Sequence, residues 1–306
     1  MIKMFKGFLA IIATFFVCMI LISIGMGMGA SGLGSMGGIS NLNKDSILYL
    51  NLDGVIYDVE DFLADLRKYS KKDNVKSVLV RINSPGGVVS PSQEIYQELV
   101  RVRDELKKPV VVFGDALVAS GGYYSAIGAS EIVVNSGTMM GSIGVIMQFS
   151  NLEKLYSWAK MDPFVIKSGK YKDSGASFRE MRPDEKDLFQ NMINEVYLQF
   201  RNAVIKERNL SQDIMDKYAD GRIFTGETAV KIGFADKLGG YNVALKTAAE
   251  LGGLSVEDPS IFTPPPAKDE FLKTLLESKT SVSAKAVDLL RPALYGKPLF
   301  LMPGTF

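Results

Sequence analysis

Apolar residues between Lys44 and Asn135 gather in short blocks separated by polar stretches, a pattern that predicts strands alternating with helices. Strands are expected at 46–56, 76–83, 109–114 and 131–135, and helices at 58–69, 90–106 and 120–129. The centre of the segment 76–83 (KSVLVRIN) is nearly all apolar, as in a parallel strand buried on both faces. These repeats predict an α/β fold with parallel strand pairing and right-handed crossovers.

Beyond residue 150 the pattern predicts mainly helices, one of them long. A helix is expected at 152–161, a strand at 163–167 and a long amphipathic helix at 183–207. In that long helix Leu188, Met192, Val196 and Phe200 recur every four residues, which predicts that they pack in the core. Glycines at 226, 233 and 239 punctuate shorter helices, and the three prolines at 264–266 mark a break after the folded unit.

The N-terminal segment has the pattern of a membrane anchor. Lys3 and Lys6 precede a strongly apolar run at 8–24, which is long enough to span a bilayer. Positive charge before this run places the N-terminus in the cytoplasm and the rest of the chain outside, in a periplasmic or extracellular position. A cleaved secretory signal is the alternative, since the stretch 25–38, rich in Gly, Ala and Ser, could hold a cleavage site. We therefore divide the chain into an anchor and tether (1–40), a main folded domain (41–255) and a C-terminal extension (256–306).

Composition removes several classes of function. Lys and Arg number 35 against 34 Asp and Glu, a net charge of +1 that gives no support for nucleic-acid binding. The chain has no histidine and one cysteine, which nearly excludes a zinc or iron–sulfur site. No loop has the ligand spacing of a calcium or magnesium site, so no metal and no cofactor is expected.

Ser120 is the first candidate for chemistry. It lies in the segment 118–124 (VASGGYY) after an apolar run, where a parallel strand would end and a short helix begin. A serine there could simply cap the helix. The same position stands at the carboxyl edge of the sheet, where ligands bind, and Gly121 after it could offer an unhindered N–H. A serine nucleophile usually borrows a histidine as base, and lysine is the known substitute.

A second constellation is Asn83 to Gly87 (NSPGG), which also follows a strand. It could be a generic turn. Paired with Ser120, its glycines could adopt positive φ and bring the Gly87 N–H to a developing oxyanion. Immediately after it, Ser90 has the pattern of a helix N-cap, with Pro91 at the first helical position and Gln93 at the capping-box position.

The base could be one of three lysines in the segment 167–173, Lys167, Lys170 and Lys172. A lysine that acts as a base must be neutral, which requires its pKa to fall from about 10.4 toward neutrality through burial in an apolar site. Composition alone does not choose among the three, and most lysines of any protein are solvated surface residues.

Four motifs in order resemble the signal peptide peptidase A (protease IV) family, and they lie at 84–87 (SPGG), 119–124 (ASGGYY), 140–145 (MGSIGV) and 168–173 (SGKYKD). The stretch 220–236 is also similar to that family, and the resemblance covers about residues 46–250. It implies a Clp-protease/crotonase-like fold of repeated ββα-type units and a serine–lysine dyad. By motif, Ser120 is the nucleophile, Lys172 the general base, Gly87 and Gly121 the oxyanion donors, and Ser142 the residue that orients the lysine amine.

The resemblance further implies a membrane-anchored serine endopeptidase that hydrolyses hydrophobic peptides, including remnant signal peptides. Some members carry two tandem copies of the unit, whereas this chain resembles the short form with one copy that holds both dyad residues. Members assemble into rings or domes, so a homo-oligomer is expected, with eight copies suggested for a one-copy chain. Two rivals stay open: an inactive membrane scaffold or peptide-binding assembly of the same fold, and a crotonase-like acyl-CoA enzyme.

Overall fold

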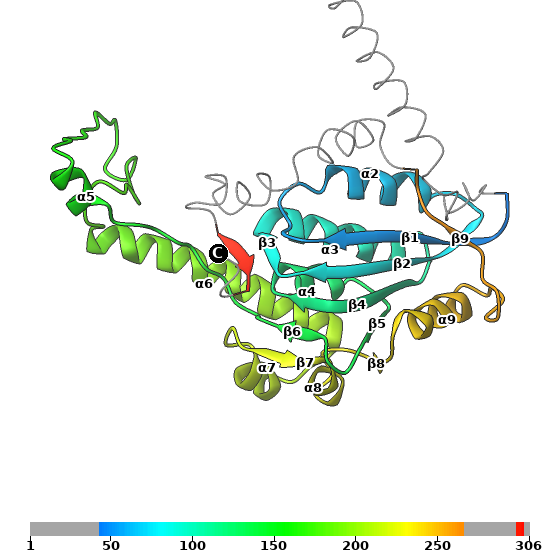
Figure 1. Ribbon diagram of the computed structural model, residues 1–306. Coiled ribbons are helices and arrows are strands. Elements are labelled where there is room, and N and C mark those ends of the chain that lie inside the picture. The colour runs from blue at the N-terminus through cyan, green and yellow to red at the C-terminus, as the bar shows by residue number, and fades with distance from the viewer. Residues whose placement is uncertain (1–42, 266–297, 303–306) are drawn as a thin grey trace, which may run out of the picture. The chain divides into compact units, whose positions relative to one another are not determined.

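A computed structural model describes residues 43–265 and 298–302. The predicted membrane anchor and most of the predicted C-terminal extension lie outside these residues. Within them, the ribbon in Figure 1 shows a sheet flanked by helices, which confirms the predicted α/β class. None of the helices in the described ranges is both long and apolar enough to cross a membrane.

The main sheet is mixed but mostly parallel. Its order is β7-β6-β4-β2-β1-β9, with β5 pairing β4 and β8. All pairs are parallel except β6 with β7. The strands are β1 (Ser46–Asp53), β2 (Val75–Ser84), β4 (Val110–Ala119), β5 (Glu131–Val134), β6 (Met139–Gly141), β7 (Ile223–Thr225), β8 (Lys237–Leu238) and β9 (Ile261–Phe262).

Two hydrophobic clusters sandwich the central strands. Alternate residues point to opposite faces of a strand, and here both faces are apolar. One face packs against α2 (Glu60–Tyr69), α3 (Val89–Asp104) and α4 (Gly121–Ala126), and the other against α9 (Tyr241–Leu251). Thus Leu48, Val78 and Val110 belong to the first cluster, while their neighbours Leu79 and Val111 belong to the second. This double burial explains the continuous apolar runs of the sequence.

Residues of the predicted C-terminal extension also add strands. β9 pairs with β1, and β10 (Leu299–Leu301) pairs antiparallel with β3 (Gly86–Val88) in a separate two-stranded sheet. The remaining helices are α5 (Glu153–Trp158), α6 (Pro183–Arg208), α7 (Gln212–Tyr218) and α8 (Gly226–Lys231).

Three local predictions are wrong. Residues 163–167 form no strand, and their apolar side chains are exposed, Ile166 to 92 %. Ser90 is not a helix cap, because β3 runs directly into α3 and Val88 takes the N-cap position. There Ser92 Oγ, one turn on, donates to the Val88 carbonyl at 2.9 Å. The turn predicted at 84–87 instead contains the start of β3.

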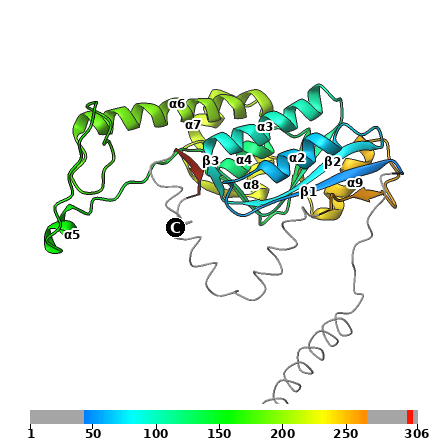
Figure 2. The same ribbon diagram turned by 90° about the horizontal axis from the view of Figure 1, so that it is seen from above.

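The long helix is correctly placed but only half of it packs in the core. Phe200 is fully buried, whereas Leu188 and Met192 are 40 % and 39 % exposed. In both views the N-terminal part of α6 extends away from the sheet, together with α5 and its flanking loops (Figures 1 and 2). We call residues 147–192 the arm and the rest of the described chain the body. Helical periodicity identified the apolar face of α6 but could not say how far along the helix the body reaches.

Candidate active site

Ser120 stands where β4 ends and α4 begins. Its φ is +51°, a conformation that residues with a side chain rarely adopt, and its N–H donates to the Gly141 carbonyl at 2.8 Å. The residue is fully buried, and its Oγ has no hydrogen-bond partner. Buried hydroxyls are nearly always paired, so an unpaired one held in a strained backbone is typical of a functional group.

The helix-cap interpretation of Ser120 is not supported by its side chain. Ser120 occupies the N-cap position of α4 but makes no side-chain capping bond. The helix is held by other contacts: the Tyr123 hydroxyl donates to the Phe234 carbonyl at 2.9 Å, and the Ser125 hydroxyl donates to the Gly121 carbonyl at 2.9 Å. The fold therefore fixes the backbone of Ser120 and leaves its hydroxyl available.

Gly87 and Gly121 lie side by side next to this hydroxyl. A Cβ added to Gly121 would lie 3.1 Å from the Gly87 nitrogen and 2.4 Å from Ser92 Oγ. A Cβ on Gly87 would lie 1.9 Å from the Ile56 carbonyl oxygen. A side chain on Gly87 would require a shift of the Ile56 backbone, and one on Gly121 would displace the Ser92 hydroxyl, so both glycines allow a close approach. The positive φ that the sequence suggested falls on Gly86, at +98°.

Ser142 lies at the end of the neighbouring strand. β6 pairs with the end of β4, with Gly141 opposite Ala119, so Ser142 follows the residue that bonds the Ser120 N–H. It is 3 % exposed, its φ is +53°, and its N–H donates to the Arg222 carbonyl at 2.7 Å. Ser142 and Ser120 therefore lie at the same edge of the sheet, at the ends of two paired strands.

Strand β10 lies beside Gly87 at this site, and the sequence did not predict it. The Ile56 N–H and carbonyl bond Gly86 and Val88, so Gly87 turns its own N–H and carbonyl to the other side, toward its partner Phe300. Leu299 exchanges both backbone bonds with Ile146, at 2.9 and 3.0 Å. β10 thus lies between two chain segments as an added strand, drawn as the red arrow in Figure 1. A proline-flanked apolar stretch near the C-terminus gave no signal for this pairing.

Lys172 lies in the arm, in an exposed turn where its N–H donates to the Gly169 carbonyl. Its neighbours are engaged: Lys167 pairs with Asp173, and Lys170 pairs with Asp184 at 2.8 Å. Within the described part of the chain, Lys172 is the member of this trio whose amine makes no ion pair. The structure thereby distinguishes Lys172 from Lys167 and Lys170 by its lack of an ion pair, which composition could not do.

The turn that carries Lys172 is fixed to the start of α6. Asp173 pairs with Arg179 at 3.1 Å, and Arg179 in turn pairs with the fully buried Glu185 at 2.6 Å. Lys167 and Arg179 hold the pKa of the Asp173 carboxyl below its ordinary value, and Arg179 lowers the pKa of the Glu185 carboxyl to about 2. The bonds from Arg179 are the largest cause for Glu185, and the bond from Lys167 is the largest for Asp173.

Ser120 and Lys172 are not brought together within one chain. Next to Ser120, Tyr124 packs against Phe200 of α6 with ring centroids 4.8 Å apart. Phe200 lies fifteen residues along the helix from Glu185, where the Lys172 turn is attached. At 1.5 Å per residue these two points are about 22 Å apart, several times the reach of a lysine side chain. The dyad therefore stays a prediction that this single chain does not complete.

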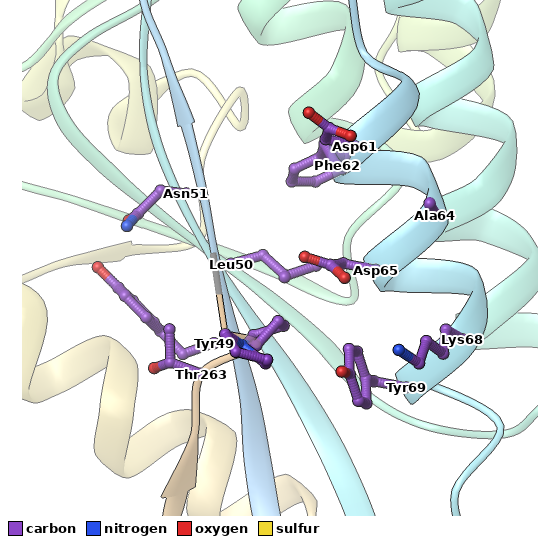
Figure 3. A pocket seen from close by; sticks show the side chains of 12 residues that line it. Tyr49, Leu50, Asn51, Asp61, Phe62, Ala64, Asp65, Lys68, Tyr69 and Thr263 are labelled. Carbon is purple, nitrogen blue, oxygen red and sulfur yellow. The ribbon is translucent and has the colours of Figure 1, made fainter. Parts of the chain in front are cut away.

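Two clefts on the surface are large enough to bind a ligand. One of about 440 Å³ adjoins the site and is lined by Ser142 to Ile146, residues of α6 and Leu301. A second of about 720 Å³ lies between β1 and α2, where Asp61, Asp65 and Lys68 edge a space that also meets Tyr49 (Figure 3). None of the predicted site residues lines it. No group of three potential metal ligands occurs within the described ranges.

Comparison with known proteins gives a consistent result. Residues 103–255 match peptidase family S49. A candidate protease of Synechocystis sp. is 45 % identical over 191 residues, 60 % of this chain and 68 % of its own length. A candidate protease of Methanocaldococcus jannaschii is 39 % identical over 69 % of this chain and 63 % of its own length. A candidate signal peptide peptidase of Enterococcus faecium is 34 % identical over 64 % of this chain and 61 % of its own length.

Proposed function

Because the chain belongs to peptidase family S49, the serine peptidases of the signal peptide peptidase type, we propose that it hydrolyses hydrophobic peptides with Ser120 as nucleophile. The family resemblance stated from the motifs is confirmed by these matches. The mostly parallel sheet, with the serine at its carboxyl edge, is consistent with a Clp-protease/crotonase-like fold. The observation that carries the proposal is the buried, unpaired Ser120 hydroxyl beside the adjacent glycines at 87 and 121.

The reaction is acyl transfer. Ser120 Oγ attacks the peptide carbonyl carbon, and its proton passes to the neutral amine of Lys172. The carbonyl oxygen becomes an oxyanion, which the Gly87 and Gly121 N–H groups stabilise by roughly 3–4 kcal/mol each. The C–N bond then breaks as the lysine returns the proton to the leaving amine. Water, deprotonated by the same lysine, releases the acyl group and regenerates the serine. Ser142 orients the lysine amine in this scheme.

The dyad is completed between copies of the chain. The arm carries Lys172 away from Ser120 of its own chain, and ten of the eighteen large apolar side chains exposed in the described residues lie between Leu152 and Met192. Exposed apolar surface of this extent is typical of a protein contact. In a ring of copies, each arm would cover a neighbour and deliver Lys172 to that neighbour's Ser120. The predicted homo-oligomer, with eight copies expected, has this closed head-to-tail form.

A membrane setting is part of the proposal. The apolar run at 8–24 would anchor the chain, with the catalytic body outside the cytoplasm and remnant signal peptides as substrates. An apolar site lined by Ile143, Val145 and Ile146 beside Ser142 suits such hydrophobic peptides.

The proposal is tested by labelling the membrane fraction with a serine-directed fluorophosphonate and locating the modified residue by mass spectrometry. We expect the label on Ser120 and its loss in Ser120→Ala, with Ser90→Ala, an exposed serine of α3, as the matched control. A protein that takes no label and cleaves no hydrophobic peptide would instead be the inactive scaffold of the same fold.

A further inference from the structure

The C-terminal strand β10 lies in the groove as a substrate would. Because Leu299 turns both backbone groups to Ile146, the alternation of an antiparallel strand turns those of Phe300 toward Gly87. The Phe300 carbonyl oxygen also lies close to Gly86 and Gly121, since Cβ atoms added there would approach it to 2.0 and 3.1 Å. A carbonyl in this position faces the two amides that would bind the oxyanion. The Met302 N–H continues the ladder by donating to the Pro85 carbonyl at 2.9 Å.

The side chain of Phe300 fills an aromatic pocket. It is fully buried, stacks on Tyr124 with ring centroids 5.0 Å apart, and meets Phe200 at 4.7 Å. Tyr96 closes the cluster behind Tyr124 at 5.4 Å. Burial raises the pKa of the Tyr124 phenol, as expected for a pocket with little water. Aromatic rings pack there in the offset and tilted arrangements that they prefer.

From these two observations we infer that this pocket selects an aromatic residue immediately before the bond to be cut, with Tyr124 and Phe200 as the specificity-determining residues. The inference rests on the proposed peptidase function and deepens it. Phe300 marks the position because its carbonyl faces the Gly87 amide while its ring occupies the pocket. A small side chain would leave the pocket partly empty, and a carboxylate would be buried there without a counter-charge, which is costly.

Phe200 is a residue that no serine-peptidase motif would identify. It lies on α6, eighty residues from Ser120 along the chain, and it is one of the α6 residues expected only to pack in the core. The sequence prediction of its burial is correct, but its partners include the strand in the groove. Tyr124, in contrast, is the last residue of the Ser120 motif at 119–124, and it belongs to both α4 and the pocket.

The test uses the full chain in detergent and quenched-fluorescence peptides built on Lys-Pro-Leu-Phe-Leu-Met, the sequence of residues 297–302. The phenylalanine is kept or replaced by alanine or aspartate, and products are identified by mass spectrometry. We expect cleavage after phenylalanine, with kcat/KM about 10–100-fold above the alanine peptide and no measurable cleavage of the aspartate peptide. Phe300→Ala, which empties the pocket of its own side chain, should raise all rates and leave the ratio unchanged.

Phe200→Ala, and the milder Phe200→Leu in case the first does not fold, should lower the ratio of phenylalanine to alanine cleavage about tenfold. Leu198→Ala is the matched control, because Leu198 is on the same helix and is 52 % exposed. An unchanged ratio in the Phe200 variants, or cleavage with no preference in the parent, overturns the inference and leaves the peptidase intact. Hydrolysis of none of the peptides by the parent or Phe300→Ala overturns the proposed function and the inference with it.

Discussion

The body and the arm differ in how far a single chain fixes and buries their residues. In the body, Ser120, Gly87, Gly121 and Ser142 are fixed by backbone bonds at one sheet edge, and nearly every apolar side chain around them is buried. In the arm, α5 has no buried residue, and Trp158, Phe164 and Ile166 are 81 %, 83 % and 92 % exposed. The arm is held by ion pairs among Asp173, Arg179 and Glu185 and by one aromatic contact, between Phe149 and Phe189.

The contrast shows that the two regions differ both in how much of their apolar surface is buried and in which proposed catalytic groups they carry. The body carries the proposed nucleophile and oxyanion donors, which need a rigid backbone. The arm carries the proposed base and an apolar surface that the single chain leaves uncovered. A peptidase assembled in this way would be active only as an oligomer, since each site takes parts from two copies.

The largest effect is expected from the dyad itself. Ser120→Ala and Lys172→Ala should each lower kcat for a hydrophobic peptide by about 10⁴-fold or more. If the dyad forms between copies, co-assembly of the two variants in equal amounts should restore about a quarter of the parent activity, because random closed rings then contain intact sites. Mixed assemblies without recovered activity would place both residues of each site on one chain.

A change confined to the body should be nearly as severe. In Gly87→Ala the added methyl would lie 1.9 Å from the Ile56 carbonyl oxygen, so β3 must move and its N–H leaves the oxyanion position. We expect kcat to fall by about 10²–10³-fold, the effect of losing one oxyanion donor. Gly137→Ala, at another position of the body where nothing lies within 4 Å of the added methyl, is the matched control and should keep its activity. A fully active Gly87→Ala protein would remove this glycine from the mechanism.

A change confined to the arm surface should act on assembly instead. Phe164→Ser removes an exposed aromatic side chain, which should weaken contact between copies by about 2 kcal/mol if it lies at the centre of the interface. The free energy of unfolding of the separate chain should change by no more than about 0.5 kcal/mol. Sedimentation velocity measures the first quantity and urea unfolding the second. Leu251→Ser, an exposed position on α9 of the body, should leave assembly unchanged.

The smallest effect should appear in acid. The Glu185 carboxyl has a pKa of about 2 against 4.5 for the ordinary group, so its ion pairs stabilise the folded arm above pH 4.5. That stabilisation is lost as the pH falls from 4.5 toward 2, and Asp173 and Asp184, whose pKa values are also lowered, act in the same direction. Trp158, the one tryptophan of the chain, lies in the arm and reports its mobility by fluorescence anisotropy.

Glu185→Gln should weaken the acid transition of the Trp158 signal, because this variant cannot lose a charge at that position. Circular dichroism of the body provides the comparison and should change less over the same pH range. An arm that loosens no sooner than the body, in both proteins, would contradict the ion-pair account.

The alternation of strands and helices was predictable because each central strand is buried on both faces and each helix has one apolar face. The edge that carries Ser120 was predictable for a related reason, since glycines after a strand indicate close approach of the backbone. Where local signals failed, a longer-range contact decided the structure. Residues 163–167 have the composition of a strand but no neighbouring strand to pair with, and Ser90 lost the cap position because β3 continues into the helix.

By itself, the sequence determined the family and the α/β class and proposed the residues of the site, because these follow from apolar periodicity and from motifs a few residues long. Only the tertiary structure decided that the turn carrying Lys172 is attached at Glu185, about 22 Å along α6 from Phe200, and that Phe300 and Phe200 meet beside Ser120. Those relations join residues far apart in the chain. They depend on where a rigid helix leaves the core and on which strand edge remains open. The local pattern of apolar and polar residues predicts neither.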